Sequence, residues 1–151
     1  MIQPVRRRTY ARELCLQFLY MYELQKESAL EELDAFIAHH TKGVRDVEGR
    51  PVIKKFTQYL SNGVIENADL IDNWAVSVAH NWPIKRMALI DRNILRIAIF
   101  ELLEEDQDAP PKGVINEAIE LAKKFSSSKS GKFVNGILNQ VMLLIQTAKE
   151  G

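Results

Sequence analysis

Basic side chains gather at two places in the sequence, one near each end of the chain. Four arginines precede the first acidic residue, Glu13. They are Arg6, Arg7, Arg8 and Arg12. Near the other end, the segment 121–149 holds five lysines and no Asp or Glu, although the formal net charge of the whole chain is zero. Arginine pairs with phosphate through a fork of donors and stacks on bases, so these segments favour contact with nucleic acid over two ordinary solvated faces.

The stretch SSSKSGKFVNGILNQV, residues 126–141, changes from a Ser/Gly-rich break to an apolar helical pattern. Ser127, Ser128 or Ser130 can cap the helix that begins here. A helix N-terminus presents unpaired N–H groups and a partial positive charge, which suit an anionic phosphate. Lys129 and Lys132 add full charges, so the stretch predicts a phosphate contact.

Two side chains at this junction each have two interpretations. Phe133 lies at the edge of the apolar stripe, where its ring either joins the core or tilts outward to stack on a base. The amide of Asn135 either serves a neighbouring carbonyl group or hydrogen-bonds a base edge. Both residues are therefore candidate RNA contacts, together with Ser130.

The residue types needed for catalysis or metal binding are sparse. Cys15 lies on an apolar helical stripe with no neighbour in sequence that would lower the pKa of its thiol, which predicts a buried structural role. His39 and His40 are adjacent and cannot chelate one metal across a helix turn, and His80 stands alone. Phosphate-binding loops of the Walker or dinucleotide type are missing. The sequence therefore predicts no enzyme, no cofactor and no metal site.

Length and composition fit one folded domain. The chain has 151 residues, of which 46% are hydrophobic, enough for a substantial core. The single cysteine cannot form a disulfide within the chain. We find neither a signal peptide nor an apolar stretch that could span a bilayer, so we expect a cytoplasmic protein without a membrane partner.

The apolar pattern is helical throughout and predicts an all-α fold of about seven helices. A capping-box pattern, Ser28 followed by Glu31, opens one of them. Pro83 breaks the pattern and suggests a join between sub-bundles of about 1–80 and 84–151. The helical segments are 6–25, 28–40, 52–80 (with a kink or break), 87–105, 114–125 and 130–148.

Three motifs spread over the chain resemble the NusB family of bacterial transcription antitermination factors. They are RRRTYAREL at residues 6–14, DRNILRIAIFELL at 91–103, and INEAIELAKKF with SGKFVNGILNQV at 115–141. The resemblance implies two packed three-helix-like bundles. It also implies binding of the boxA element of ribosomal RNA leader transcripts together with NusE, a small-subunit ribosomal protein. Other Nus factors and RNA polymerase complete the antitermination complex that this resemblance implies.

The resemblance assigns roles to particular residues. The arginine-rich N-terminus of the family contributes to its RNA site, which corresponds to the four arginines here, although the Thr-Tyr spacing after the first three leaves their register open. The start of the central helix, Asp91 and Arg92, is implied in the NusE interface, with Glu13 and Tyr20 as neighbours. Asp91 also has a simpler interpretation, as an acid favoured by the helix dipole. Tyr20 can equally cover the core with its hydroxyl group in water.

We expect the arginine segment and the 126–135 junction to form one continuous RNA-binding face. Two other functions fit the sequence: a helical protein–protein adaptor that binds no RNA, and the RNA-binding subunit of an rRNA-modifying enzyme. The chain contains no segment for a cofactor-binding α/β domain, which favours the free-standing factor. The sequence leaves open whether the free protein is a monomer or a homodimer, and the resemblance makes a homodimer one alternative, because some family members associate through surfaces that otherwise meet RNA or NusE.

Overall fold

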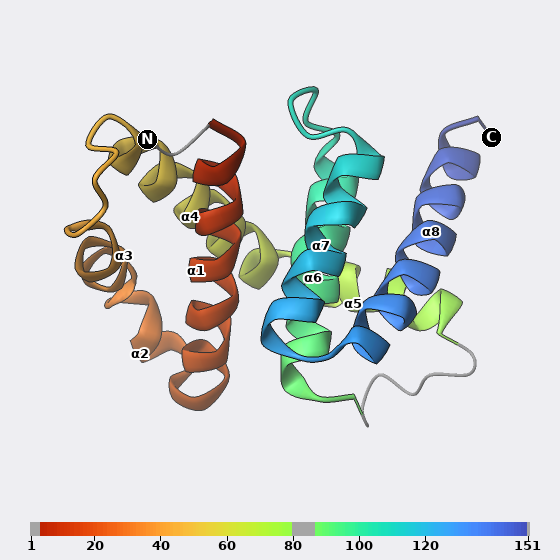
Figure 1. Cartoon of the computed structure of the whole chain (residues 1–151). Coiled ribbons are helices and arrows are strands. Elements are labelled where there is room, and N and C mark those ends of the chain that lie inside the picture. Colours follow the sequence, from red (N-terminus) through yellow and green to blue (C-terminus); the bar gives the residue numbers. More distant parts are fainter. Residues whose placement is uncertain (1–3, 80–86, 151) are drawn as a thin grey trace. The chain divides into compact units, whose positions relative to one another are not determined.

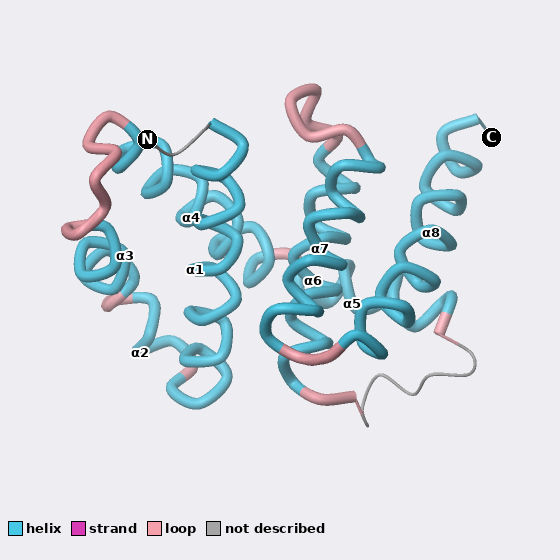
Figure 2. Tube along the Cα trace, viewed as in Figure 1, coloured by secondary structure: helices cyan, strands magenta, loops and turns pink. Residues whose placement is uncertain are grey.

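The computed structural model describes residues 4–79 and 87–150, and every regular element in these ranges is a helix (Figures 1 and 2). The all-α prediction is confirmed, with eight helices in the described ranges where about seven were expected. They are α1 (Pro4–Gln25), α2 (Glu27–Leu30), α3 (Leu33–Thr41), α4 (Gly49–Glu66), α5 (Ala68–Val78), α6 (Leu89–Glu104), α7 (Pro111–Phe125) and α8 (Ser128–Glu150).

Two compact units make up the chain, Met1–Ile65 and Glu66–Gly151, which we call the first and second units. The division falls at the junction of α4 and α5, where Asn67 interrupts the helical segment expected over 52–80. Helix α5 belongs to the second unit because it contacts α6 and α8. The join suggested at Pro83 lies outside the described residues.

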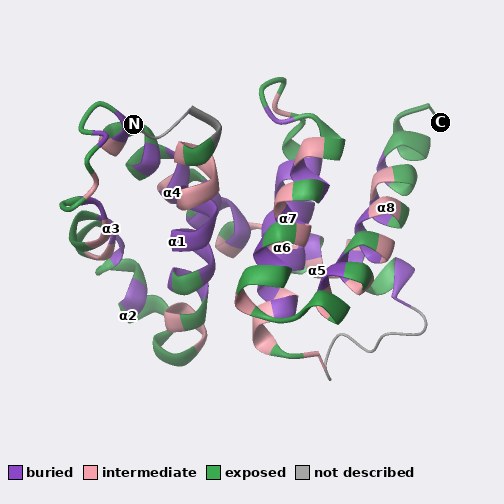
Figure 3. Cartoon of the chain, in the orientation of Figure 1, coloured by how far each residue is buried: buried purple, intermediate pink, exposed green. Residues whose placement is uncertain are grey.

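In the first unit, α1 contacts α2 and α3 through an apolar cluster. Phe18, Ala29, Leu33 and Ile37 form its buried centre. Burial of each large apolar side chain contributes about 1.5–3 kcal/mol to folding. Figure 3 shows the buried stripe that runs along α1. This cluster fixes the helix that carries the arginine segment.

The helix expected over 28–40 is divided, and its capping box is not formed. The Ser28 hydroxyl group donates to the Gln25 carbonyl oxygen at 2.8 Å instead of accepting an N–H group. Helix α2 ends at Leu30, and α3 starts at Leu33. The serine therefore serves the end of α1 rather than the start of a long helix.

In the second unit, α6 contacts α5, α7 and α8, which confirms its predicted central place. It ends at Glu104, and the left-handed backbone of the following residue, Glu105 (φ 57°), caps the helix. Pro111 then occupies the first turn of α7, a position where the missing N–H group of proline costs nothing. Helix α8 packs mainly on α7 and starts at Ser128, two residues before the expected start.

No helix in the described part of the chain combines the length and the apolarity needed to cross a bilayer.

Candidate nucleic-acid interface

The arginine segment lies in the first turns of α1, and its four side chains differ in exposure. Arg6 is exposed, Arg7 and Arg8 are half-buried, and Arg12 is only 4% exposed. Arg8 and Arg12 are four residues apart, so both lie on one side of the helix. Arg6 therefore presents the most accessible charge of the segment, and burial leaves Arg12 little surface for a phosphate.

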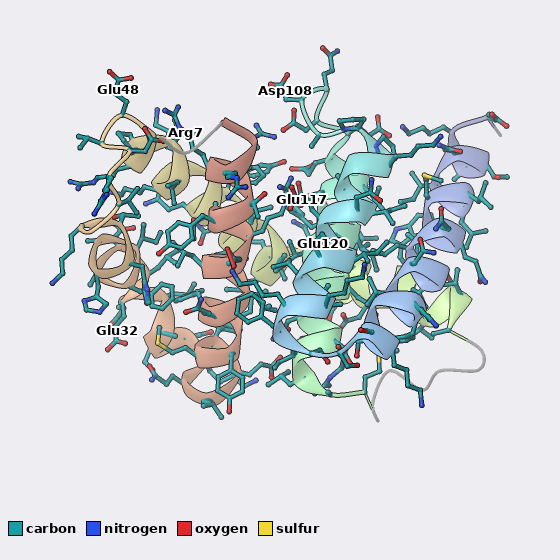
Figure 4. The ribbon with its side chains drawn as sticks, viewed as in Figure 1. Arg7, Glu32, Glu48, Asp108, Glu117 and Glu120 are labelled. Atoms are coloured by element: carbon teal, nitrogen blue, oxygen red, sulfur yellow. The ribbon has the colours of Figure 1, made fainter. Side chains whose placement is uncertain are left out.

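Arg7 is held by an ion pair with Asp46, in the loop between α3 and α4. Its Nε and Nη2 groups donate to the two carboxylate oxygens at 2.6 and 2.9 Å. The Gly49 N–H group donates to the same carboxylate at 3.2 Å. Figure 4 shows Arg7 and Glu48 at the same end of the first unit. The contact with Asp46 ties α1 to this loop, so Arg7 has a structural role whatever else it binds.

This ion pair changes the protonation of both partners. The hydrogen bond from Arg7 lowers the pKa of Asp46, against the opposing effect of its burial. The same hydrogen bond raises the pKa of Arg7. Asp46 therefore stays ionised over the physiological range, and it balances most of the Arg7 charge that a phosphate would otherwise meet.

Gly49 admits the ion pair. A Cβ atom at this position would lie 2.2 Å from Asp46 Oδ2 and 2.7 Å from Arg7 Nε, far inside van der Waals contact. Any other residue would displace the carboxylate, the guanidinium or the start of α4. The glycine is thus required by the close approach of the charged pair.

Arg8 and Arg12 lie against an aromatic ring of α4. Their guanidinium carbons are 4.4 and 5.3 Å from the centroid of the Phe56 ring, within the range of a cation–π contact. The Phe56 ring in turn stacks on Tyr59 at 5.9 Å, with 24° between the ring planes. Arginines from α1 and aromatic rings from α4 therefore form one surface of the first unit.

The second candidate region is the start of α8 in the second unit. The Ser127 hydroxyl oxygen accepts the Ser130 N–H group at 3.1 Å, which makes Ser127 the cap among the three predicted serines. Lys129, Lys132 and Asn135 are exposed here. This tip keeps the basic, acid-free character that the sequence predicts.

The two ambiguous side chains of the tip take intermediate positions. Phe133 is half-buried, so its ring contributes to packing and still presents an edge or face to solvent. Asn135 accepts a hydrogen bond from the Asn139 amide at 2.7 Å, one turn along α8. Gly136 has no atom of the described residues within 4 Å of where a Cβ would lie, so close helix packing does not explain this glycine.

Ser130 links the tip to the start of α6. Its hydroxyl group donates to Asp91 Oδ2 at 3.1 Å. Asp91 lies in the first turn of α6 and is 8% exposed. Its other oxygen, Oδ1, is buried without a hydrogen-bond partner in the described ranges, as are Arg92 Nε and Asn93 Nδ2. A residue expected to bind RNA and one expected to bind a protein are thus in direct contact.

The two expected partner contacts on α1 differ sharply. Glu13 is 9% exposed, whereas Tyr20 is 51% exposed. An exposed tyrosine ring offers a partner more surface than a nearly buried carboxylate does, whether that of Glu13 or that of Asp91. Tyr20 is therefore the better placed of the two, and its ring does not cover the core.

One region of the interface has no counterpart in the sequence prediction. The signal was present: between Arg50 and Ile65, along α4, there are three basic residues and no acid. The apolar residues Phe56 and Leu60 indicate a helix that packs on the core, so the basic residues that precede them were not predicted as part of the interface. The contacts of Arg8 and Arg12 with Phe56 connect α4 to the arginine segment.

Cys15 is fully buried, as predicted for a structural thiol. Among the described residues, no three His, Cys, Asp or Glu side chains gather closely enough to hold a metal ion. The candidate interface combines cations, hydroxyl groups and aromatic rings with the carboxylates of Asp46 and Asp91. Cations and aromatic rings bind anions and flat bases.

Known proteins resemble the chain over most of its length. A family model, the NusB family, matches residues 9–143. The chain is 46% identical over 132 residues to transcription antitermination protein NusB of Chloroherpeton thalassium, covering 87% of this chain and 59% of that protein. It is 41% identical over 145 residues to the protein of the same name from Anaeromyxobacter dehalogenans strain 2CP-1, covering 96% of each.

Among solved structures, one of antitermination factors NusB and NusE in complex with dsRNA contains a chain of the same fold. The TM-score is 0.75 at 24% identity, covering 92% of this chain and 98% of that one. This likeness concerns the fold, whereas the family model and the two relatives carry the sequence relationship. The chain therefore belongs to the NusB family.

Proposed function

We propose that this chain is a transcription antitermination factor that binds the boxA element of ribosomal RNA leader transcripts together with NusE. Family membership supports this function, and the solved relative that contains NusB, NusE and RNA agrees with it. The chain acts by binding rather than by catalysis, in the cytoplasm, as one RNA-binding domain. Other Nus factors and RNA polymerase complete the assembly.

The observation that carries the proposal is the arginine–aromatic surface of the first unit. Guanidinium groups beside aromatic rings provide phosphate pairing and base stacking in one place, a combination that suits unpaired RNA. Arg6 and Arg8 supply its accessible charge, and Arg7 positions them through Asp46. Lys129 and Lys132, at the tip of α8 in the second unit, are proposed as separate phosphate contacts.

A titration with labelled RNA tests this function directly. The full chain, with and without NusE, is titrated into a fluorescent single-stranded RNA that carries a boxA element, and anisotropy is recorded. We expect specific binding, tighter than to a scrambled RNA of the same length and stronger with NusE present. Binding to NusE without any preference for boxA would instead indicate a protein–protein adaptor.

The partner surface is proposed at the start of α6, with Tyr20 of α1 as a second contact. Because Asp91 is nearly buried, a charge reversal there also destabilises the fold. Asp91→Asn is the sharper variant, since its amide oxygen still accepts the Ser130 hydroxyl group. We expect this variant to weaken the NusE complex with little change in the thermal midpoint. An unchanged affinity for NusE would remove Asp91 from the interface.

A further inference from the structure

Helix α4 carries three basic residues and no acid between Arg50 and Ile65, and Glu66 is its last residue. Of its cations, Lys54 and Lys55 are exposed, while Arg50 Nε donates to the Val44 carbonyl oxygen at 2.9 Å. Val52, Lys55 and Tyr59 are three and four residues apart, so they share one side of the helix. All three are exposed. The outward side of α4 thus presents an aromatic ring one turn from a lysine.

The Tyr59 ring is the outer member of a stack. Phe56 is 8% exposed, with the Arg8 guanidinium 4.4 Å from its centroid. Tyr59 lies beside Phe56 with nearly parallel planes and is 40% exposed. The inner ring is therefore covered, Arg8 is half-buried, and Tyr59 is the exposed ring of the stack.

Tyr59 differs from an isolated aromatic residue on the surface, because a neighbouring ring fixes its orientation. Phe56, Leu60 and Val64 already supply the core side of α4. Tyr59 adds little to that core, yet its ring is held flat by Phe56 and fixed on a long helix. A rigid ring loses little conformational entropy when a flat ligand stacks on it. Aromatic rings beside cations are the usual platform for unpaired bases.

We propose that Tyr59 is a base-stacking platform for single-stranded RNA, with Lys55 one turn away at a neighbouring phosphate. The platform extends the arginine segment of α1 onto α4, entirely within the first unit. It rests on the proposed RNA-binding function and adds a contact site to it. The ligand is an unpaired nucleotide on either side of, or within, the recognised element.

The test is an anisotropy titration of the full chain with the labelled boxA RNA. Tyr59→Ala is expected to weaken binding about 5- to 150-fold, the range for losing one stacked base. Tyr59→Phe keeps the aromatic face and stays within about twofold of wild type. Tyr59→Leu keeps an apolar contact with Phe56 but loses the aromatic face, so it behaves like the alanine variant. Leu24→Ala, an exposed side chain of α1 outside the site, is the matched control.

Salt dependence separates stacking from charge. Tyr59→Ala leaves the slope of log K against log salt unchanged, whereas Lys55→Ala reduces its magnitude by about 0.7, the value for one phosphate of a single strand. Circular dichroism melts verify that each variant is folded.

The possible outcomes test the Tyr59 platform and the proposed RNA-binding function separately. If wild type binds boxA RNA and both Tyr59→Ala and Tyr59→Leu bind equally well, the platform is wrong and the proposed function stands. If wild type binds no RNA, the proposed function fails first. If the variants lose affinity for NusE but not for RNA, the ring belongs to a protein interface and the platform is also overturned.

Discussion

Three of the four arginines of α1 in the first unit contact neighbouring side chains, whereas the lysines at the tip of α8 in the second unit are exposed. Arg7 is locked to Asp46 by two hydrogen bonds, and Arg8 lies on the Phe56 ring. Lys129 and Lys132 are exposed on the first turns of their helix. Two acid-poor basic runs thus produce different surfaces.

The chemistry of the two cations explains this difference. A guanidinium group is planar, weakly hydrated and able to pair with a carboxylate through two donors, so it packs well against rings and acids. An ammonium group is strongly hydrated and stays in water at the end of a flexible stem. The arginine surface is therefore pre-organised, and the lysine tip supplies mainly long-range attraction. The following variants separate these two roles.

The largest effect is expected from Gly49→Ala, which disrupts the ion pair that holds Arg7. The added methyl group collides with Asp46 and Arg7, so the variant should lose about 1–3 kcal/mol of unfolding free energy, as over-packed sites do. Urea denaturation followed by circular dichroism measures the loss. Gly136→Ala on α8 is the matched control, because its methyl group meets open space and should add up to about 1 kcal/mol. Equal effects of the two substitutions would contradict a close-packed charged pair.

Removing the tip lysines should affect RNA binding more than removing the locked arginine does. The double variant Lys129→Ala/Lys132→Ala is expected to reduce the magnitude of the salt slope by about 1.4, from two lost phosphate contacts at about 0.7 each. Arg7→Ala should leave the slope near the wild-type value, because Asp46 already balances that charge. Anisotropy titrations at several salt concentrations give these slopes. A larger change for Arg7 than for the two lysines would reverse the assignment.

Loss of the serine cap should loosen the start of α8 by a moderate amount. Ser127→Ala removes the acceptor for the Ser130 N–H group and should cost about 1 kcal/mol of stability. The thermal midpoint measures this loss, and Ser127→Asp serves as the control because aspartate is an equally good cap. Should alanine and aspartate give the same midpoint, Ser127 is not the cap that holds this helix.

The smallest expected effect is on the acid dependence of stability, through the ion pair between Arg7 and Asp46. The pKa of Asp46 is lowered in the folded chain, so the folded state binds fewer protons than the unfolded state as pH falls. The stabilisation is complete above the unfolded pKa, about 4, and is lost as pH falls through the lower folded value. Thermal melts between pH 2 and 6 should show that Asp46→Asn loses less stability than wild type as the pH falls. Glu48→Gln, on the exposed loop beside it, controls for general charge effects.

Several features of this fold were accessible from residue pattern alone. Helical periodicity predicts that the apolar segments form helices, because apolar residues at i, i+3 and i+4 lie on one side of a helix and are buried together. The break at Pro110 and Pro111 is equally local, since proline lacks the N–H group that a continuing helix needs. The division of 28–40 was missed because Ser28 bonds backward to Gln25, a local choice that the capping-box pattern does not distinguish.

The candidate site could be predicted from the sequence only in part. The basic runs at both ends and the serine-rich helix start follow from composition, and the first unit and the tip of α8 keep that character. The sequence could not predict which side chain each cation contacts, because contacting residues such as Arg7 and Asp46 are 39 positions apart in the chain. The same holds for Ser130 and Asp91, which are also 39 positions apart.

The sequence by itself determined that the chain is helical, that it belongs to the NusB family, and where its charges concentrate, since these depend on periodicity and on the order of residues. Only the tertiary structure decided which arginines are locked, which serine caps α8, and that Tyr59 closes a stack begun by Arg8. The physical reason is distance. Ion pairs, cation–π contacts and close approaches at a glycine act over a few ångströms, and folding alone determines which distant residues come that close.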